Sequence, residues 1–210
     1  MRFPDAHAGI KKIFTAEILA LIAILLAGIG TIAAAVAAAG VAAQENGVAA
    51  VSVGGMAIAL LAAGIIAIIA FIMNLVGLAQ AGKDEKQYIH TAFICTIIGL
   101  ICSVIATVLS ASTFGSILKT VSDVMSIISI LFVCKGIMVL AEQLNDEGVA
   151  SFANKAQWLI AIVYAVGVIV SVLPVSKAVA VIAVIAVILK LVSVICYLVL
   201  LARAKTMLQA

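Results

Sequence analysis

The chain has 210 residues, of which 67% are apolar and only 10% are charged, and its net charge is +3. A soluble domain is about half apolar and about a quarter charged, so this composition excludes an ordinary soluble protein and predicts an integral membrane protein. The positive charge is too small and too dispersed to indicate nucleic acid as a partner. The expected environment is a lipid bilayer.

Six apolar runs follow one another along the chain, separated by short polar breaks. Each approaches or exceeds the roughly 20 residues that a helix needs to cross about 30 Å of hydrocarbon. The sequence therefore predicts an all-α, polytopic bundle of six transmembrane helices in a single membrane domain, 1–210. The first run exceeds the core of a signal peptide, roughly 7 to 15 residues, so we expect it to remain in the mature protein. The six runs cover about 13–43, 48–80, 88–112, 117–141, 156–175 and 178–202.

A short repeat divides these helices into pairs. LAQAGKDE at 78–85 recurs as LAEQLNDE at 140–147, and IFTAEIL at 13–19 shares an Ile-x-Thr-Ala frame with IHTAFIC at 89–95. The pattern indicates three helical hairpins, about 1–82, 83–144 and 145–210, from an ancestral duplication. The first is longer and rich in Ala and Gly. A helix of about 31 residues spans roughly 46 Å, so we expect this hairpin to tilt or to project from the bilayer.

The distribution of Lys and Arg predicts the orientation, because loops on the cytoplasmic side carry the excess of these residues. Only Lys119 and Lys177 lie at one set of helix ends. Both chain termini are therefore expected on the cytoplasmic side of the cell membrane. The opposite, richer set contains Arg2, Lys11, Lys12, Lys83, Lys86, Lys155, Arg203 and Lys205.

Small residues recur at helical spacing in the first two runs. In a bilayer, close approach of backbones over small side chains is a usual source of helix affinity. We therefore predict that the two stripes pack on each other, with a homo-oligomer or a membrane protein partner on this face as the competing interpretation. The packing seam comprises Ala16, Ala20, Ala23, Ala27, Gly30 and Ala34 in the first run and Ala59, Ala63, Ala67 and Ala70 in the second.

Three residues near the predicted cytoplasmic interface have ordinary roles available. Lys135 is close enough to the interface for its stem to carry the ammonium to water, and Glu17 is about one turn inside the first helix, where an interfacial carboxylate is expected. Trp158 lies where an aromatic belt forms. The KDE and NDE clusters are expected to be solvated helix caps rather than ion sites.

Lys190 is the polar residue that these roles do not explain. About 12 residues separate it from Lys177 and about 13 from Arg203, so roughly 16 to 18 Å of helix lie between it and either interface. Charged residues at such depth are rare and usually functional, and we predict that Lys190 points into the bundle. Three arrangements are open: Lys190 lies in a cluster of polar side chains, it pairs with Asp123, or it has no partner. The predicted cluster adds Ser126, Ser129, Ser103 and Tyr164.

Motifs for soluble catalysis are missing from the sequence, and the four cysteines lie within apolar runs, where packing is their expected role. We therefore expect no enzyme, no metal and no cofactor. The predicted function is that of a small permease, channel or sensor for a solute or ion whose identity the residues do not give. The alternative is a non-transporting assembly or accessory subunit that binds partner helices through the Ala/Gly seam.

Overall fold

The computed structural model describes residues 3–42, 46–109, 112–172 and 177–209, and side chains for 3–31, 57–109, 112–167, 185 and 188–209. These residues are helical with short connections and contain no strand, which confirms the predicted all-α class. Within these ranges, six helices are long and apolar enough to cross a membrane. They are α1 (Pro4–Ala42), α2 (Asn46–Asp84), α3 (Ile89–Val108), α4 (Thr113–Gln143), α5 (Glu147–Val172) and α6 (Lys177–Gln209).

Two helices begin well before the apolar runs that predicted them. Helix α1 starts at Pro4, and α5 starts at Glu147 within a polar stretch predicted to be a turn. The turn between α4 and α5 is shorter because Asn145 adopts φ 55°, which lets the chain leave α4 abruptly. The Asp146 carboxylate then accepts the Val149 N–H at 3.0 Å and caps α5. Hydropathy detects the apolar part of a helix, so these polar first turns were missed.

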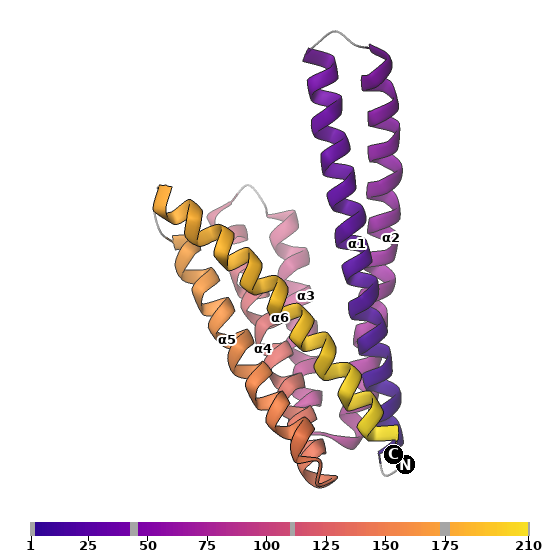
Figure 1. The fold of residues 1–210 in the computed structure, drawn as a ribbon, viewed down its shortest axis with the longest axis vertical. Helices are drawn as coiled ribbons and strands as arrows, with labels where there is room; N and C mark the ends of the chain where they lie inside the picture. The colour runs from indigo at the N-terminus through magenta and orange to yellow at the C-terminus, as the bar shows by residue number, and fades with distance from the viewer. Residues whose placement is uncertain (1–2, 43–45, 110–111, 173–176, 210) are drawn as a thin grey trace. The chain divides into compact units, whose positions relative to one another are not determined.

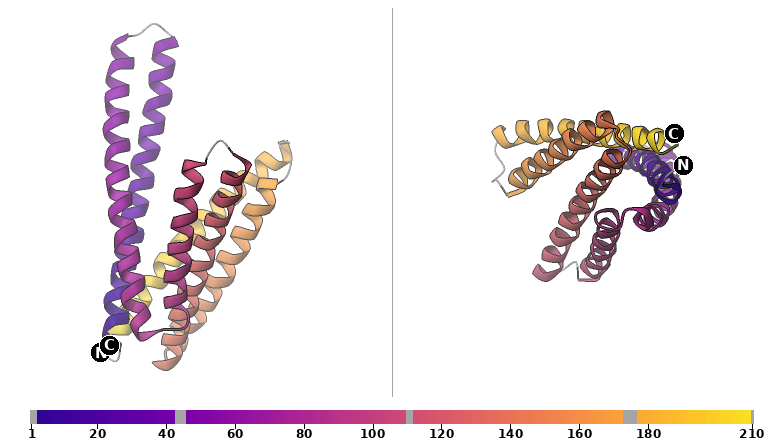
Figure 2. Two further views of the ribbon diagram at one scale, coloured as in Figure 1. Left: turned by 180° about the vertical axis from the view of Figure 1, so that it is seen from behind. Right: turned by 90° about the horizontal axis from the view of Figure 1, so that it is seen from below.

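The chain divides into two compact units. One unit is Lys12–Val76, in which the long parts of α1 and α2 run antiparallel side by side (Figures 1 and 2). The other comprises Met1–Lys11 and Gly77–Ala210 and contains α3 to α6. The predicted hairpin repeat stays a prediction.

In the larger unit, α4 is the central helix. It packs against α3 and α5, α5 packs against α6, and a smaller contact joins α4 to α6. Figure 1 shows these four helices with successive helices antiparallel. The antiparallel order follows from the short connections between them.

The core of this unit gathers near the α4–α5 turn. Ile137 and Leu140 of α4, Ala153 of α5 and Leu201 of α6 are all fully buried. The Arg203 guanidinium lies 4.6 Å from the centroid of the Phe152 ring and joins α6 to α5 at the same end. Elsewhere, exposed Ile, Leu and Val side chains cover the outer faces of the helices. Such faces are compatible with a bilayer, because apolar side chains surrounded by lipid tails need not be buried within the protein.

Serine hydroxyls and a glycine join α3 to α4. The Ser122 hydroxyl donates to the Gly99 carbonyl oxygen at 2.8 Å, and the Ser129 hydroxyl donates to the Ala92 carbonyl oxygen at 3.0 Å. Thr96 and Ser129 share a further hydrogen bond of 2.7 Å. Helices approach this closely where one of them carries Gly or Ala, and the hydroxyl groups then reach across.

Two adjacent carboxylates hold the start of α1 and the start of α3. Asp84 Oδ2 accepts the Ala6 N–H at 2.7 Å. Glu85 is only 6% exposed, and its carboxylate accepts N–H groups from Gln87, Tyr88 and Ile89 at 3.2, 2.7 and 2.6 Å. The prediction that these acids are helix caps is therefore confirmed, except that Glu85 is buried rather than solvated.

Candidate functional site

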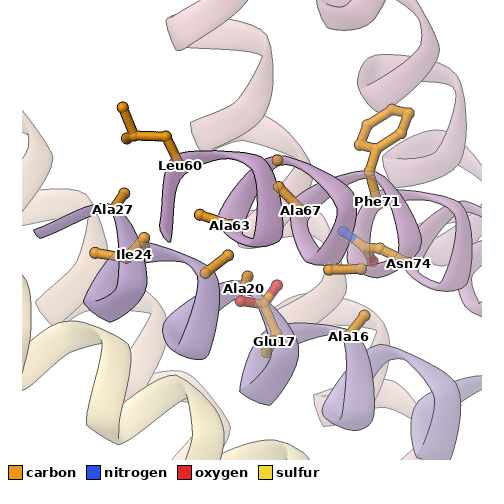
Figure 3. A pocket seen from close by; sticks show the side chains of 13 residues that line it. Ala16, Glu17, Ala20, Ile24, Ala27, Leu60, Ala63, Ala67, Phe71 and Asn74 are labelled. Atoms are coloured by element: carbon orange, nitrogen blue, oxygen red, sulfur yellow. The ribbon is translucent and has the colours of Figure 1, made fainter. Parts of the chain in front are cut away.

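A groove opens between α1 and α2 in the Lys12–Val76 unit (Figure 3). Its volume is about 520 Å³, and most of its lining is apolar. Ile24, Leu60 and Phe71 contribute its larger side chains. Pockets of about 300 to 1,000 Å³ with apolar walls and few polar groups are typical of small-molecule sites, so the groove is the strongest candidate site.

The predicted small-residue stripes form the facing walls of this groove. A Cβ at Gly30 would lie 3.1 Å from Leu60 Cγ and 3.6 Å from Ala59 Cβ, so the helices are close there. Ala16, Ala23, Ala63 and Ala70 are nearly fully buried, and beside them the methyl groups are too short to fill the space, so a groove remains open along the helices. The predicted packing of the two stripes on each other stays a prediction. Ala34 lies outside the residues whose side chains are described. The wall residues from the predicted seam are Ala16, Ala20, Ala23, Ala27, Ala63, Ala67 and Ala70.

Glu17 and Asn74 supply the polar groups of the groove. Figure 3 shows the Glu17 carboxylate directed from α1 toward α2, with the Asn74 side chain also in the groove. No hydrogen bond or salt bridge to Glu17 occurs among the described residues. The sequence interpretation of Glu17 as an ordinary interfacial carboxylate missed this location.

A signal for Glu17 was nevertheless present in the sequence. Glu17, Ala20, Ile24 and Ala27 are spaced by three, four and three residues, which places them on one helix face. Three of these four positions are small or apolar groove residues. A carboxylate on a helix face that is predicted to meet another helix therefore indicates a candidate site.

Lys190 lies elsewhere, on α6, and its side chain is exposed. Its ammonium nitrogen lies 5.5 Å from the centroid of the Tyr164 ring on α5, a cation–π contact. The carbonyl of Lys190 accepts the hydroxyl of Ser193 at 2.8 Å. The prediction that Lys190 points into the bundle is therefore wrong for the single chain, while its proximity to Tyr164 is present.

The rest of the predicted polar cluster does not come together around Lys190. Asp123, Ser126 and Ser103 are exposed on α3 and α4, and no salt bridge joins Asp123 to Lys190 in the described chain. Ser129 is buried, but its hydroxyl is used between α3 and α4. Equal depth in the bilayer does not place two side chains on facing sides of their helices.

Within the described residues, His, Cys, Asp and Glu side chains form no group of three that could hold a metal ion. No protein-family model matches this chain, and neither does any curated protein or solved structure. The groove, the exposed Lys190 and their chemistry are therefore the basis for a functional proposal.

Proposed function

We propose that this multi-pass membrane protein binds a small lipophilic cation in the groove between α1 and α2, as a permease or a sensor. The observation that carries the proposal is Glu17, a carboxylate that faces an apolar groove without a partner among the described residues. The role proposed is binding and movement or detection of a solute, without catalysis.

The chemistry of the groove supports this ligand class. An ionised carboxylate in apolar surroundings is costly unless a cation or hydrogen-bond donors compensate it. The alanine methyl groups and Phe71 suit a hydrocarbon surface, and the Asn74 amide offers a further hydrogen-bonding group. A compact ion with a tightly held hydration shell gains little from such walls. A cation with an apolar surface of its own would pair with the Glu17 carboxylate and also contact the apolar side chains of the lining.

Replacing Glu17 with Gln tests the proposal, with tetraphenylphosphonium as the probe. We expect the affinity of the purified protein in nanodiscs to fall about tenfold, measured by isothermal titration calorimetry, because the attraction of the carboxylate is lost. Glu142→Gln is the matched control, since Glu142 is exposed on α4 and outside the groove. Equal binding by the wild type and Glu17→Gln would contradict the proposed site.

The alternative is an assembly or accessory subunit, and the exposed Lys190 favours it. In the described chain Lys190 has an aromatic ring beside it but no acid in a salt bridge, and lipid tails cannot compensate an ammonium. A carboxylate on a partner helix would do so. The small-residue walls of the groove would then also be surfaces for partner helices.

Lys190→Met separates the two functions. We expect a permease or sensor to keep its tetraphenylphosphonium affinity after this change, whereas an assembly subunit should lose a co-purifying membrane partner. The measurement is paired: calorimetry on the purified variant and quantitative mass spectrometry of the proteins that co-purify with it. Lys119→Met is the control for removal of an exposed lysine from another helix. Loss of a co-purifying partner from Lys190→Met but not from Lys119→Met would support the assembly role, and unchanged co-purification would contradict it.

The location proposed is the cell membrane, with both termini on the cytoplasmic side. The support is the distribution of Lys and Arg between the two sets of helix ends. In this orientation, the α4–α5 turn also lies on the cytoplasmic side.

A further inference from the structure

A second pocket lies between α4 and α5 and has a different chemical character from the groove. Its volume is about 250 Å³, and its lining comprises Leu131 and Lys135 of α4 and Asn154, Gln157, Trp158 and Ala161 of α5. All six residues belong to the larger unit. An ammonium and two amide groups therefore open into one pocket.

The polar groups of the pocket are available to a ligand. Lys135 Nζ lies 3.9 Å from Met138 Sδ, a weak acceptor, and makes no salt bridge in the described chain. The side chains of Asn154 and Gln157 have no hydrogen-bond partner among the described residues. One cation and two amide groups offer donors for an anion that has several oxygen atoms.

The lining changes from polar to apolar with distance from the α4–α5 turn. Counted along each helix from Asn145, Asn154 and Lys135 are nearest the turn, then Gln157 and Trp158, and Leu131 and Ala161 are farthest. A hydrated free anion would gain no favourable contact from the apolar end of the pocket. A phospholipid has this same order of groups, with phosphate followed by glycerol and acyl chains.

The depth of the pocket also fits a headgroup. Helix α4 has 31 residues, so about 46 Å of helix extends roughly 8 Å beyond each side of a hydrocarbon layer of about 30 Å. Lys135 lies eight residues before Gln143, roughly 12 Å from the helix end. Its Cα is then roughly 4 Å inside the hydrocarbon boundary, and its stem carries the ammonium to the level of the phosphates. Trp158 is 66% exposed and lies three residues farther from Asn145 than Lys135 does, roughly 4.5 Å deeper along the helices.

We propose that the α4–α5 pocket binds the phosphate of an anionic phospholipid through Lys135, Asn154 and Gln157, with Leu131 and Ala161 against the acyl chains. The site is separate from the groove and does not depend on the function proposed for it. Anionic lipids are concentrated in the cytoplasmic leaflet, which the predicted orientation places at this end of α4.

Trp158 provides the measurement, because it is the single tryptophan of the chain and lines the pocket. In nanodiscs containing small amounts of brominated lipid, we expect brominated phosphatidylglycerol to quench Trp158 more strongly than brominated phosphatidylcholine. Lys135→Met should reduce this preference about fivefold, the expected effect of one lysine at an anionic surface. Lys135→Arg should retain it.

Lys119→Met is the matched control, since Lys119 is the other lysine of α4 and lies outside the pocket. Its lipid preference should equal that of the wild type. Gln157→Leu, which keeps all charges, should also weaken the preference, and it replaces Lys135→Met if that variant loses its helical circular dichroism. Equal quenching by the two lipids in the wild type, or equal losses in the Lys119 and Lys135 variants, would overturn the proposal. Displacement of the brominated lipid by millimolar inorganic phosphate would overturn the choice of a lipid.

Discussion

Gly9→Ala is expected to destabilise the protein by about 3 kcal/mol, at the upper end of the usual cost of overpacking. A Cβ at Gly9 would lie 2.5 Å from the Ala81 nitrogen and 2.5 Å from the Gly77 carbonyl oxygen. Both are backbone atoms of α2, which cannot rotate away as a side chain would. The start of α1 and the end of α2 would have to separate, although Ile10 and Leu78 are buried beside this contact.

Thermal unfolding in detergent measures the effect in a background with Cys95, Cys102 and Cys196 replaced by Ser, where a fluorogenic thiol reagent reports exposure of Cys134, which is fully buried in the native fold. Gly28→Ala is the matched control on the same helix, because a Cβ at Gly28 would meet nothing within 4 Å. That change should be neutral or stabilising by up to about 1 kcal/mol, since alanine favours a helix over glycine. Equal midpoints for the two variants would show that the close contact of α1 and α2 at Gly9 is absent in the membrane protein.

Glu85→Ala is expected to cost about 2 kcal/mol, because it removes a charged acceptor from the first N–H groups of α3. Three backbone N–H groups donate to this carboxylate, and two of the bonds are shorter than the usual 2.9 Å. The residue is also buried, so water cannot readily take the place of the lost oxygens. A shorter side chain leaves these donors unsatisfied.

Glu147 is the control for this change. It occupies the equivalent position of the sequence repeat, but its side chain is exposed at the start of α5 and makes no hydrogen bond in the described chain. We expect Glu147→Ala to change the unfolding free energy by less than about 0.5 kcal/mol. The same thiol assay compares the two variants. A larger cost at Glu147 than at Glu85 would contradict the capping geometry.

The six helices were predictable because a spanning helix must be apolar over a length that the bilayer sets. The polar ends of these helices were harder to predict. Pro4 to Lys12 and Glu147 to Lys155 are helical, yet their composition resembles that of a loop. What makes them helical is capping by Asp84 and Asp146 together with packing against neighbouring helices, and hydropathy measures neither.

The rotation of each helix about its own axis was harder to predict from the sequence than the position of the helix along the chain. This rotation decides which side chains meet in a site. In a soluble protein, the polar face of a helix shows which side is outward. The helix around Lys190 is apolar on every side, so depth could be calculated and direction could not. The same limit explains Ser129, whose hydroxyl serves the α3–α4 contact instead of the predicted cluster. Glu17 was missed because its depth suggested contact with water, whereas its helix face leads into the groove.

The contacts of Asp84 and Glu85 restrict insertions and deletions at this point of the chain. The two residues are consecutive, yet the first holds the start of α1 and the second holds the start of α3. A residue inserted between them would shift one carboxylate by more than 3 Å relative to the other, and both partners could not be kept. Deletions and insertions should therefore be excluded from this connection during evolution, and an epitope or reporter placed there would separate two helices that a single dipeptide now holds in register.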